Sequence, residues 1–263
     1  MKKKVYLAVQ IVLLCVIVYC AFRIGSYLWA RMSSDRKFED VQKVVDSYRP
    51  EESETAEPAT EATPTRVNYT EMMAQLKSIN TDLVAYLDID GTQTHYPIAH
   101  LDNWFYLDHG VDKEENIQGV PFLDENNRAD FTDQNSVVYA HMMYGGDAMF
   151  AGLKHFLEQD YVDQSPKTFT ITNEAGVHHY RIFSAFRVPA DEDYRTPNVS
   201  EEAWLDYLNA TYERSFVSFG ERPDFDAADR IVTFSTCTPE RDYSMRIAVV
   251  GIYEFTQTEK ADQ

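Results

Sequence analysis

The chain has 263 residues, of which 24 are lysine or arginine and 43 are aspartate or glutamate, so its formal net charge is −19. This acidity argues against a general nucleic-acid binder, because contacts with phosphates need clustered basic side chains. The three cysteines, Cys15, Cys20 and Cys237, include no Cys-x-x-Cys pair, which excludes a disulfide framework and a thiolate zinc site. The length suits one domain of moderate size with appendages.

The segment nearest the N-terminus predicts a membrane-spanning helix. Residues 5–22 form a run of 18 residues without a charged side chain. A helix of that length rises about 27 Å, close to the thickness of the hydrocarbon core of a bilayer. A cleaved signal peptide is the alternative, but no small-x-small cleavage site follows the run. We therefore expect a cytoplasmic tip and an uncleaved anchor within residues 1–30. Basic residues flank the run on both sides, so the positive-inside rule alone leaves its orientation open.

Residues 31–67 are expected to connect this anchor to a folded domain. Apolar residues recur at helical spacing over residues 34–48, which predicts a short amphipathic helix. Residues 50–66 contain three prolines, five glutamates and no aromatic residue, a composition typical of a flexible linker. The folded domain is therefore expected to occupy residues 68–263.

The folded domain is predicted to begin with a helix and to continue mainly as short strands. Asn68 and Glu71 resemble a capping box at the start of that helix. Alternating apolar residues predict eight strands, at residues 83–89, 93–98, 120–123, 136–141, 168–173, 178–188, 230–237 and 246–255. Two further helices are expected, at 147–158 and at 200–214, the second within a long connection between strands six and seven. Many short strands with few helices predict an all-β fold, either a closed barrel or a sandwich.

Cys237 is the one cysteine outside the apolar segment, and it is the candidate nucleophile. It ends a predicted strand and precedes a polar turn, where a side chain is more exposed than in the middle of a strand. A free thiol has a pKa of about 8.5 and is mostly protonated at neutral pH, so a nucleophilic cysteine needs a neighbouring histidine or cation. Taken by itself, the position also fits a structural cysteine.

His141 is the histidine best placed to serve Cys237. It ends the predicted strand 136–141 and precedes a loop that leads into a helix. Two strand ends of one barrel can meet at the same rim, which brings together residues that are far apart in sequence. Arg246 opens the strand after Cys237 and can hold an oxyanion or a substrate carbonyl, and Arg241 is the competing candidate. We prefer Arg246, because a strand holds a guanidinium more rigidly than a turn does.

Two stretches of the chain resemble the sortase family, and within it class B. The run Val138-Tyr139-Ala140-His141 resembles the family's histidine strand, and the run Thr233-Phe234-Ser235-Thr236-Cys237, with Arg246 downstream, resembles its cysteine and arginine strands. The resemblance covers about residues 68–256, and the long helical connection before the cysteine strand favours class B over class A. It implies a closed eight-stranded sortase-type β-barrel with an N-terminal helix and a helical insertion between strands six and seven.

The resemblance also implies a reaction, that of a membrane-anchored, peptidase-like cysteine transpeptidase. Cys237 would attack the carbonyl of a Thr-x bond in a C-terminal sorting signal, His141 would transfer the proton, and Arg246 would stabilise the oxyanion. The threonine carboxyl would then be joined to an amine of the cell wall. Four positions match residues that line the class B substrate groove, namely Asn103, Leu107, Tyr139 and Ser235.

The partners and the location follow from the same resemblance. The partners would be secreted proteins that carry a sorting signal and a cell-wall peptide or lipid-linked precursor that supplies the amine. No metal, organic cofactor or nucleic acid is expected. The N-terminus would lie in the cytoplasm and the barrel outside the cell, in a Gram-positive-type bacterium. Three departures from the family pattern, Ala140, Met142 and Pro239, leave the substrate preference open.

Two alternatives remain beside this interpretation. The first is a pilin-polymerising sortase or a cysteine peptidase, because the sequence does not specify the amine acceptor. The second is a non-catalytic extracellular binding module tethered to the membrane.

Overall fold

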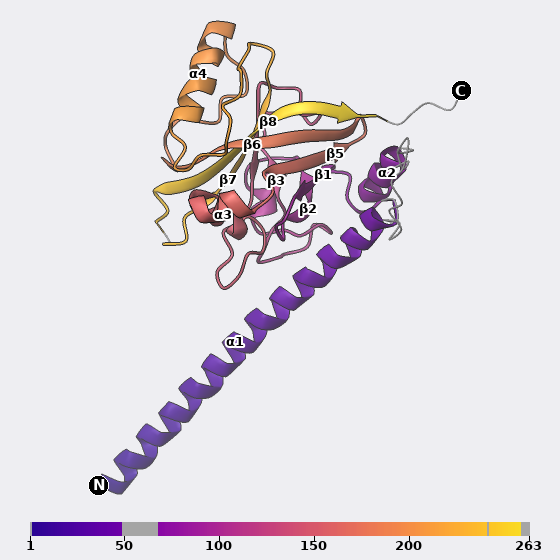
Figure 1. Cartoon of the computed structure of the whole chain (residues 1–263). Helices are drawn as coiled ribbons and strands as arrows, with labels where there is room; N and C mark the ends of the chain where they lie inside the picture. Colours follow the sequence, from indigo (N-terminus) through magenta and orange to yellow (C-terminus); the bar gives the residue numbers. More distant parts are fainter. Residues whose placement is uncertain (1, 49–67, 241, 259–263) are drawn as a thin grey trace, which may run out of the picture.

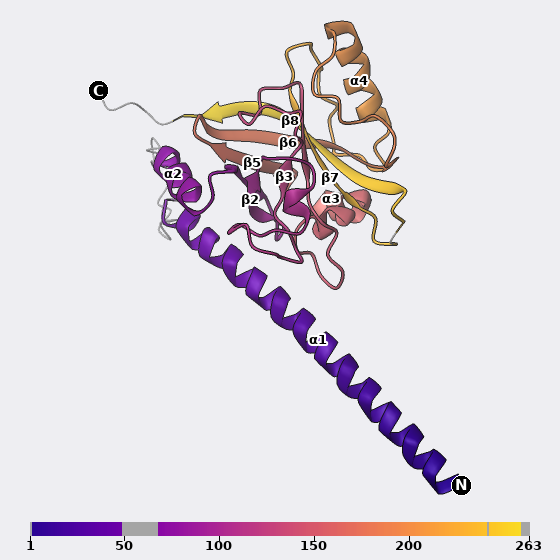
Figure 2. The same cartoon turned by 180° about the vertical axis from the view of Figure 1, so that it is seen from behind.

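Eight strands of the chain close into a single barrel (Figures 1 and 2). The computed structural model describes residues 2–48, 68–240 and 242–258. The strands are β1 Leu83–Ile89, β2 His95–Ala99, β3 Phe122–Leu123, β4 Asn135–Tyr139, β5 Thr168–Asn173, β6 Gly176–Pro189, β7 Ile231–Cys237 and β8 Met245–Gln257. Their order around the barrel is β1-β2-β3-β4-β7-β8-β6-β5, with the β2–β3 and β4–β7 pairs parallel. The barrel confirms the predicted all-β fold and decides against the sandwich.

Aromatic side chains fill the interior of the barrel. Phe169 of β5 stacks on Tyr180, with 4.8 Å between the ring centroids, and meets Phe234 of β7 edge-on at 4.7 Å. Since β5 and β7 are not neighbours in the barrel, the contact between Phe169 and Phe234 crosses the interior. Gly251 of β8 makes room for this stack, because a Cβ atom at that position would lie 2.1 Å from the Phe169 ring.

Helix α4, Glu201–Glu213, covers the outer side of the barrel and lies in the connection between β6 and β7. The Ser200 hydroxyl caps it by accepting a hydrogen bond from the backbone N–H of Ala203. Trp204 and Leu208 lie one turn apart on the same face of the helix and are buried in one cluster with Phe186 and other residues of the outer barrel wall. The structure therefore confirms the predicted helical insertion between strands six and seven.

Within residues 2–48 and 68–82, two helices precede the barrel, α1 Lys2–Asp46 and α2 Tyr69–Ile79. The amphipathic helix predicted at 34–48 is the C-terminal part of α1 rather than a separate element. Three of its apolar side chains, Phe38, Val41 and Val45, are buried. The N-terminal part of α1 is long and apolar enough to cross a membrane by length and composition. The linker predicted at 50–66 lies outside the described residues.

The helix predicted at 147–158 is the main local prediction that is wrong. The structure has a 3₁₀ helix, η2 Ala151–Leu157, followed by a short helix, α3 Gln159–Gln164. Met149 has a φ of 55°, a left-handed conformation that an α-helix cannot contain. Met149 also forms an isolated antiparallel β-bridge with Met142, which holds the two ends of the intervening loop together. The apolar spacing of this segment therefore comes from packing on the barrel and not from a regular helix.

Candidate functional site

The parallel pairing of β4 with β7 brings His141 and Cys237 to the same end of the barrel. The ladder ends with Tyr139 opposite Ser235. His141 follows Tyr139 by two residues, and Cys237 follows Ser235 by two residues. The two segments stay joined beyond this pair, because the Thr236 hydroxyl donates a hydrogen bond of 2.8 Å to the carbonyl of the residue before His141. The strand β4 ends at Tyr139 rather than at residue 141, so His141 belongs to the rim loop.

The antiparallel pairing of β7 with β8 places Arg246 directly opposite Cys237. The guanidinium Nη1 donates to the carbonyl oxygens of Tyr243 (2.8 Å) and Met245 (2.9 Å), which hold the side chain in place. Arg241, the competing candidate, lies outside the described residues. Cys237 is the last residue of its strand and is half-buried, as the sequence predicts for a thiol at a strand end.

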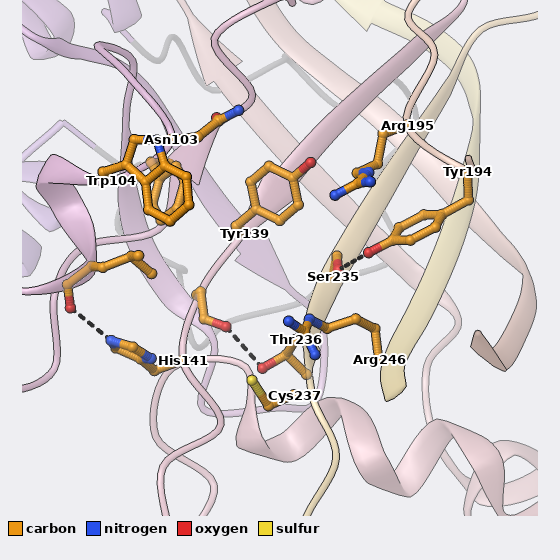
Figure 3. A pocket seen from close by; sticks show the side chains of 13 residues that line it. Asn103, Trp104, Tyr139, His141, Tyr194, Arg195, Ser235, Thr236, Cys237 and Arg246 are labelled. Carbon is orange, nitrogen blue, oxygen red and sulfur yellow. Dashed lines mark hydrogen bonds between the residues drawn. The ribbon is translucent and has the colours of Figure 1, made fainter. Parts of the chain in front are cut away.

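A pocket of about 400 Å³ opens at this end of the barrel (Figure 3). All the residues predicted from the sequence line it, namely Asn103, Leu107, Tyr139, His141, Ser235, Cys237 and Arg246. The pocket therefore brings together the predicted catalytic residues and the predicted groove residues. The pocket is also lined by Trp104, Tyr194 and Arg195, which were not predicted from the sequence. The unusual length of the connection after β6 was the one signal for the last two.

The orientation of the His141 ring is fixed by the backbone of the loop that contains Leu107. Nε2 of His141 lies 2.6 Å from the Leu107 carbonyl oxygen. A carbonyl oxygen can only accept a hydrogen bond, so Nε2 carries the hydrogen and donates it. In the neutral ring the basic nitrogen is then Nδ1. Figure 3 shows this other side of the ring turned toward the part of the pocket that holds Cys237.

A buried carboxylate supports two of the groove residues from behind. Asp124 is 5% exposed, and its Oδ2 accepts hydrogen bonds from the Tyr139 hydroxyl (2.8 Å) and from the Asn103 amide (3.2 Å). Its Oδ1 accepts from the backbone and the side chain of Asn126 (2.9 and 3.0 Å). Burial, together with the negative charge of Asp124, raises the pKa of the Tyr139 phenol, so this hydroxyl remains a donor.

Tyr194 holds the loop after β6 against the pocket. Its hydroxyl lies 2.8 Å from the Ser235 hydroxyl, and burial raises the pKa of the Tyr194 phenol. Its carbonyl oxygen accepts hydrogen bonds from the Asn135 amide (3.1 Å) and from the Tyr207 hydroxyl (2.9 Å). The loop is therefore tied to β4, β7 and α4, and its residues form a fixed wall of the pocket.

The pocket residues are suited to nucleophilic chemistry by a thiol. A cysteine, a histidine and an arginine meet at one rim, which supplies a nucleophile, a proton carrier and a cation for a developing negative charge. Among residues 2–48, 68–240 and 242–258 there is no group of three or more His, Cys, Asp or Glu side chains arranged to hold a metal ion.

Comparisons with known proteins identify the family to which the chain is similar. A model of the Sortase domain family matches residues 87–253. Sortase B of Listeria monocytogenes is 30% identical over 260 residues, which cover 95% of this chain and 98% of that protein. The crystal structure of Clostridium perfringens sortase B is 31% identical, with a TM-score of 0.64 over 69% of this chain and 99% of that one. A Staphylococcus aureus sortase B-substrate complex has a TM-score of 0.72 over 85% and 97% of the two chains, and its 22% identity supports the fold alone.

Proposed function

The chain belongs to the sortase family of cysteine transpeptidases, in class B, and from this premise we propose its reaction and the roles of its pocket residues. The enzyme cleaves a Thr-x bond in the C-terminal sorting signal of a secreted protein. It then joins the threonine carboxyl to an amine of a cell-wall peptide or of a lipid-linked precursor. The observation that supports these roles is the strand register that gathers Cys237, His141 and Arg246 at one rim.

In the first half-reaction Cys237 loses its proton to Nδ1 of His141 and attacks the threonine carbonyl carbon. A carbon–sulfur bond forms and the amide bond to the next residue breaks, while the leaving nitrogen takes the proton back from the His141 imidazolium. Nδ1 is the nitrogen that exchanges this proton, because Nε2 is engaged with the Leu107 carbonyl. Arg246 stabilises the negative charge that develops on the carbonyl oxygen, a role whose loss costs about 100-fold or more in rate in other enzymes.

In the second half-reaction an amine attacks the thioester. His141, now neutral, takes a proton from the attacking nitrogen, a carbon–nitrogen bond forms, and the Cys237 sulfur leaves as the thiolate. The product is an amide between the threonine and the acceptor. If water replaces the amine, the same residues hydrolyse the thioester, so the acceptor decides between transfer and hydrolysis.

We also propose that the apolar part of α1 anchors the enzyme in the cell membrane, with the N-terminus in the cytoplasm and the barrel outside. The support is the length and composition of this part of the helix, none of which is buried against the barrel. Tyr27 and Trp29, both exposed, follow the apolar run at the place where aromatic side chains border a bilayer. On this proposal the enzyme meets its substrates at the outer face of the cell membrane.

The decisive test uses the full-length chain in detergent with a sorting-signal peptide and a cell-wall amine. Cys237→Ala is expected to abolish cleavage and the thioester adduct that mass spectrometry detects with the wild type. The matched control replaces the two cysteines of the apolar segment, Cys15→Ala and Cys20→Ala, and is expected to keep full activity. Cleavage by Cys237→Ala would overturn the proposed nucleophile, and the absence of any wild-type adduct would favour the binding module. Hydrolysis that no amine changes would favour a peptidase.

A further inference from the structure

Arg195 is a charged residue of the pocket that has no role in the proposed reaction. It follows Tyr194 in the loop between β6 and α4, and its side chain is exposed. Figure 3 shows its guanidinium reaching over the pocket between Tyr139 and Tyr194. None of the described residues that line the pocket is an aspartate or a glutamate. The pocket is therefore a cationic site in a protein whose net charge is −19.

The guanidinium of Arg195 is available to a ligand. Within the described part of the chain it donates no hydrogen bond and has no carboxylate partner, and it lies over the Tyr194 ring at 5.4 Å from the centroid. Four other arginines of the domain are each paired with a carboxylate, in Arg128–Asp130, Arg181–Glu254, Arg187–Glu240 and Arg214–Glu192. The nearby carboxylate of Asp124 is occupied by its bonds to Tyr139, Asn103 and Asn126.

The backbone beneath Arg195 is held in place before any ligand binds. The carbonyl oxygen of Tyr194 accepts two hydrogen bonds, and the hydroxyl of Tyr194 forms a third with the Ser235 hydroxyl. Only the side chain of Arg195 must be ordered on binding, which limits the entropic cost of a contact with substrate. A fixed backbone with an unpaired guanidinium suits a residue that recognises a negatively charged group.

The chemistry of the pocket indicates which half of the substrate meets Arg195. His141 serves the leaving nitrogen, so the residues after the threonine lie on its side and the residues before the threonine lie along the rest of the pocket. Tyr194 contacts Ser235, which precedes Cys237 by two residues along β7. An extended peptide rises about 3.3 Å per residue, so a peptide that runs along β7 reaches Ser235 about two residues before the threonine. Figure 3 shows the Arg195 guanidinium farther from Cys237 than Ser235 is, so it faces positions about two or three residues before the threonine.

We propose that Arg195 selects sorting signals that carry an aspartate or a glutamate two or three residues before the cleaved threonine. This inference rests on the proposed function and adds a substrate class to it. A guanidinium binds a carboxylate through two parallel hydrogen bonds, whereas an amide of the same shape offers it one acceptor. The expected preference for an acidic peptide over its amide counterpart is about tenfold in kcat/KM, and it decreases as salt screens the exposed pair.

The experiment compares two peptide pools on the full-length enzyme in detergent. Every peptide in both pools contains one fixed threonine. At the second and third positions before this threonine, one pool carries glutamate and the other carries glutamine. All other positions are randomised. The wild type is expected to cleave the glutamate pool about tenfold faster. Arg195→Gln is expected to remove this difference, so that the variant cleaves the two pools at equal rates. Arg195→Glu is expected to favour a pool with lysine at those positions. Arg187→Gln, which removes an arginine outside the pocket, is the matched control and should keep the wild-type preference.

The outcomes separate this inference from the proposed function. Equal cleavage of the two pools by the wild type, or a preference that survives in Arg195→Gln, would overturn the role of Arg195 and leave the transpeptidase in place. Failure of the wild type to cleave either pool or to form a thioester would overturn both. Because the Arg195 side chain is exposed, these substitutions are expected to leave the melting temperature unchanged, and circular dichroism checks this.

Discussion

At the scale of single residues, Asp124 joins two pocket side chains that come from separate parts of the chain. Asp124→Asn keeps the shape of this side chain but replaces one acceptor oxygen by a donor. Because the Tyr139 hydroxyl and the Asn103 amide both donate to Oδ2, an NH2 group in that place leaves both without this acceptor. A lost buried hydrogen bond is worth about 1–2 kcal/mol. Steady-state kinetics with a sorting-signal peptide should therefore show a KM about tenfold higher and a kcat changed by less than about twofold.

Two controls separate positioning from general damage to the fold. Asp130→Asn alters a carboxylate that pairs with Arg128 outside the pocket, and it should leave KM unchanged. In a Tyr139→Phe background, Asp124→Asn should have a smaller effect than in the wild type, because part of the shared contact is already gone. A fall in kcat together with a lower melting temperature would show that Asp124 supports the fold and not the groove.

The catalytic residues were predicted from their positions at or next to strand ends, whereas Asn103 and Leu107 were predicted from the family resemblance alone. Cys237 and Arg246 follow from the alternation of apolar residues, which sets the strand limits, and their pairing then follows from the register. Tyr194 and Arg195 could not be predicted in this way. They lie in a loop whose position depends on hydrogen bonds to Tyr194 from residues of β4 and α4, and no local pattern contains those contacts.

At the scale of elements, a buried histidine ties the β5–β6 hairpin to the end of β8. His178 of β6 is 6% exposed; its Nε2 donates to the Asn173 side-chain oxygen (2.9 Å) and its Nδ1 accepts from the Thr256 hydroxyl (2.8 Å). Burial, reinforced by the nearby charge of Arg230, lowers the pKa of His178 from 6.5 to about 4. The folded barrel therefore keeps this ring neutral at a pH where the unfolded chain protonates it.

This difference predicts how the stability of the barrel depends on pH. Below pH 6.5 the unfolded chain binds a proton at His178 that the folded chain does not. The contribution of His178 to the free energy of unfolding therefore falls between pH 6.5 and about 4 and is constant below that. The full loss is on the order of 3 kcal/mol, and the part that appears between pH 7.5 and 5 is on the order of 2 kcal/mol. Urea unfolding of the wild type and of His178→Asn at pH 7.5 and 5 measures it, and the variant should lose less. Equal losses in both proteins would rule out His178 as the cause.

The elements also differ in how far the sequence determines them. Strands such as β1 and β5 were predicted with their exact limits, because their alternation reflects one buried face. The segment at 147–158 was not predicted correctly, because its conformation depends on contacts with residues outside the segment. The Tyr96 hydroxyl lies 3.2 Å from the backbone nitrogen of Met149, and the bridge with Met142 closes the loop. Tertiary contacts of this kind override a helical spacing of apolar residues.

At the scale of the whole molecule, α1 is both the proposed anchor and part of the barrel's surface. Its C-terminal part is fixed to the loop before β3, where the Ser34 hydroxyl donates to the Asn116 side chain (2.9 Å) and Lys37 pairs with Asp112 (2.5 Å). Phe38 meets the Tyr96 ring of β2 edge-on, with 5.1 Å between the ring centroids. Because this part of α1 already contacts the barrel domain, it sets the distance between the proposed anchor and the barrel. The flexible linker at 50–66 stays a prediction, since it lies outside the described residues.

Detaching this helix should therefore change the molecule without changing the pocket. Val41 and Val45 are each 2% exposed, and a buried aspartate at either position has no partner to offset its desolvation. In the double variant Val41→Asp, Val45→Asp, amide hydrogen exchange over residues 34–46 should speed up by at least about 100-fold, since a segment without tertiary contacts opens easily. Glu39→Gln, on the exposed side of the same turns, is the matched control and should exchange like the wild type.

Cleavage of a soluble peptide should persist in both variants, because the rim of Cys237 and His141 is built by β4 and β7. Unchanged protection in the double variant would show that α1 does not depend on these contacts, whereas lost peptide cleavage would show that the helix supports the pocket as well.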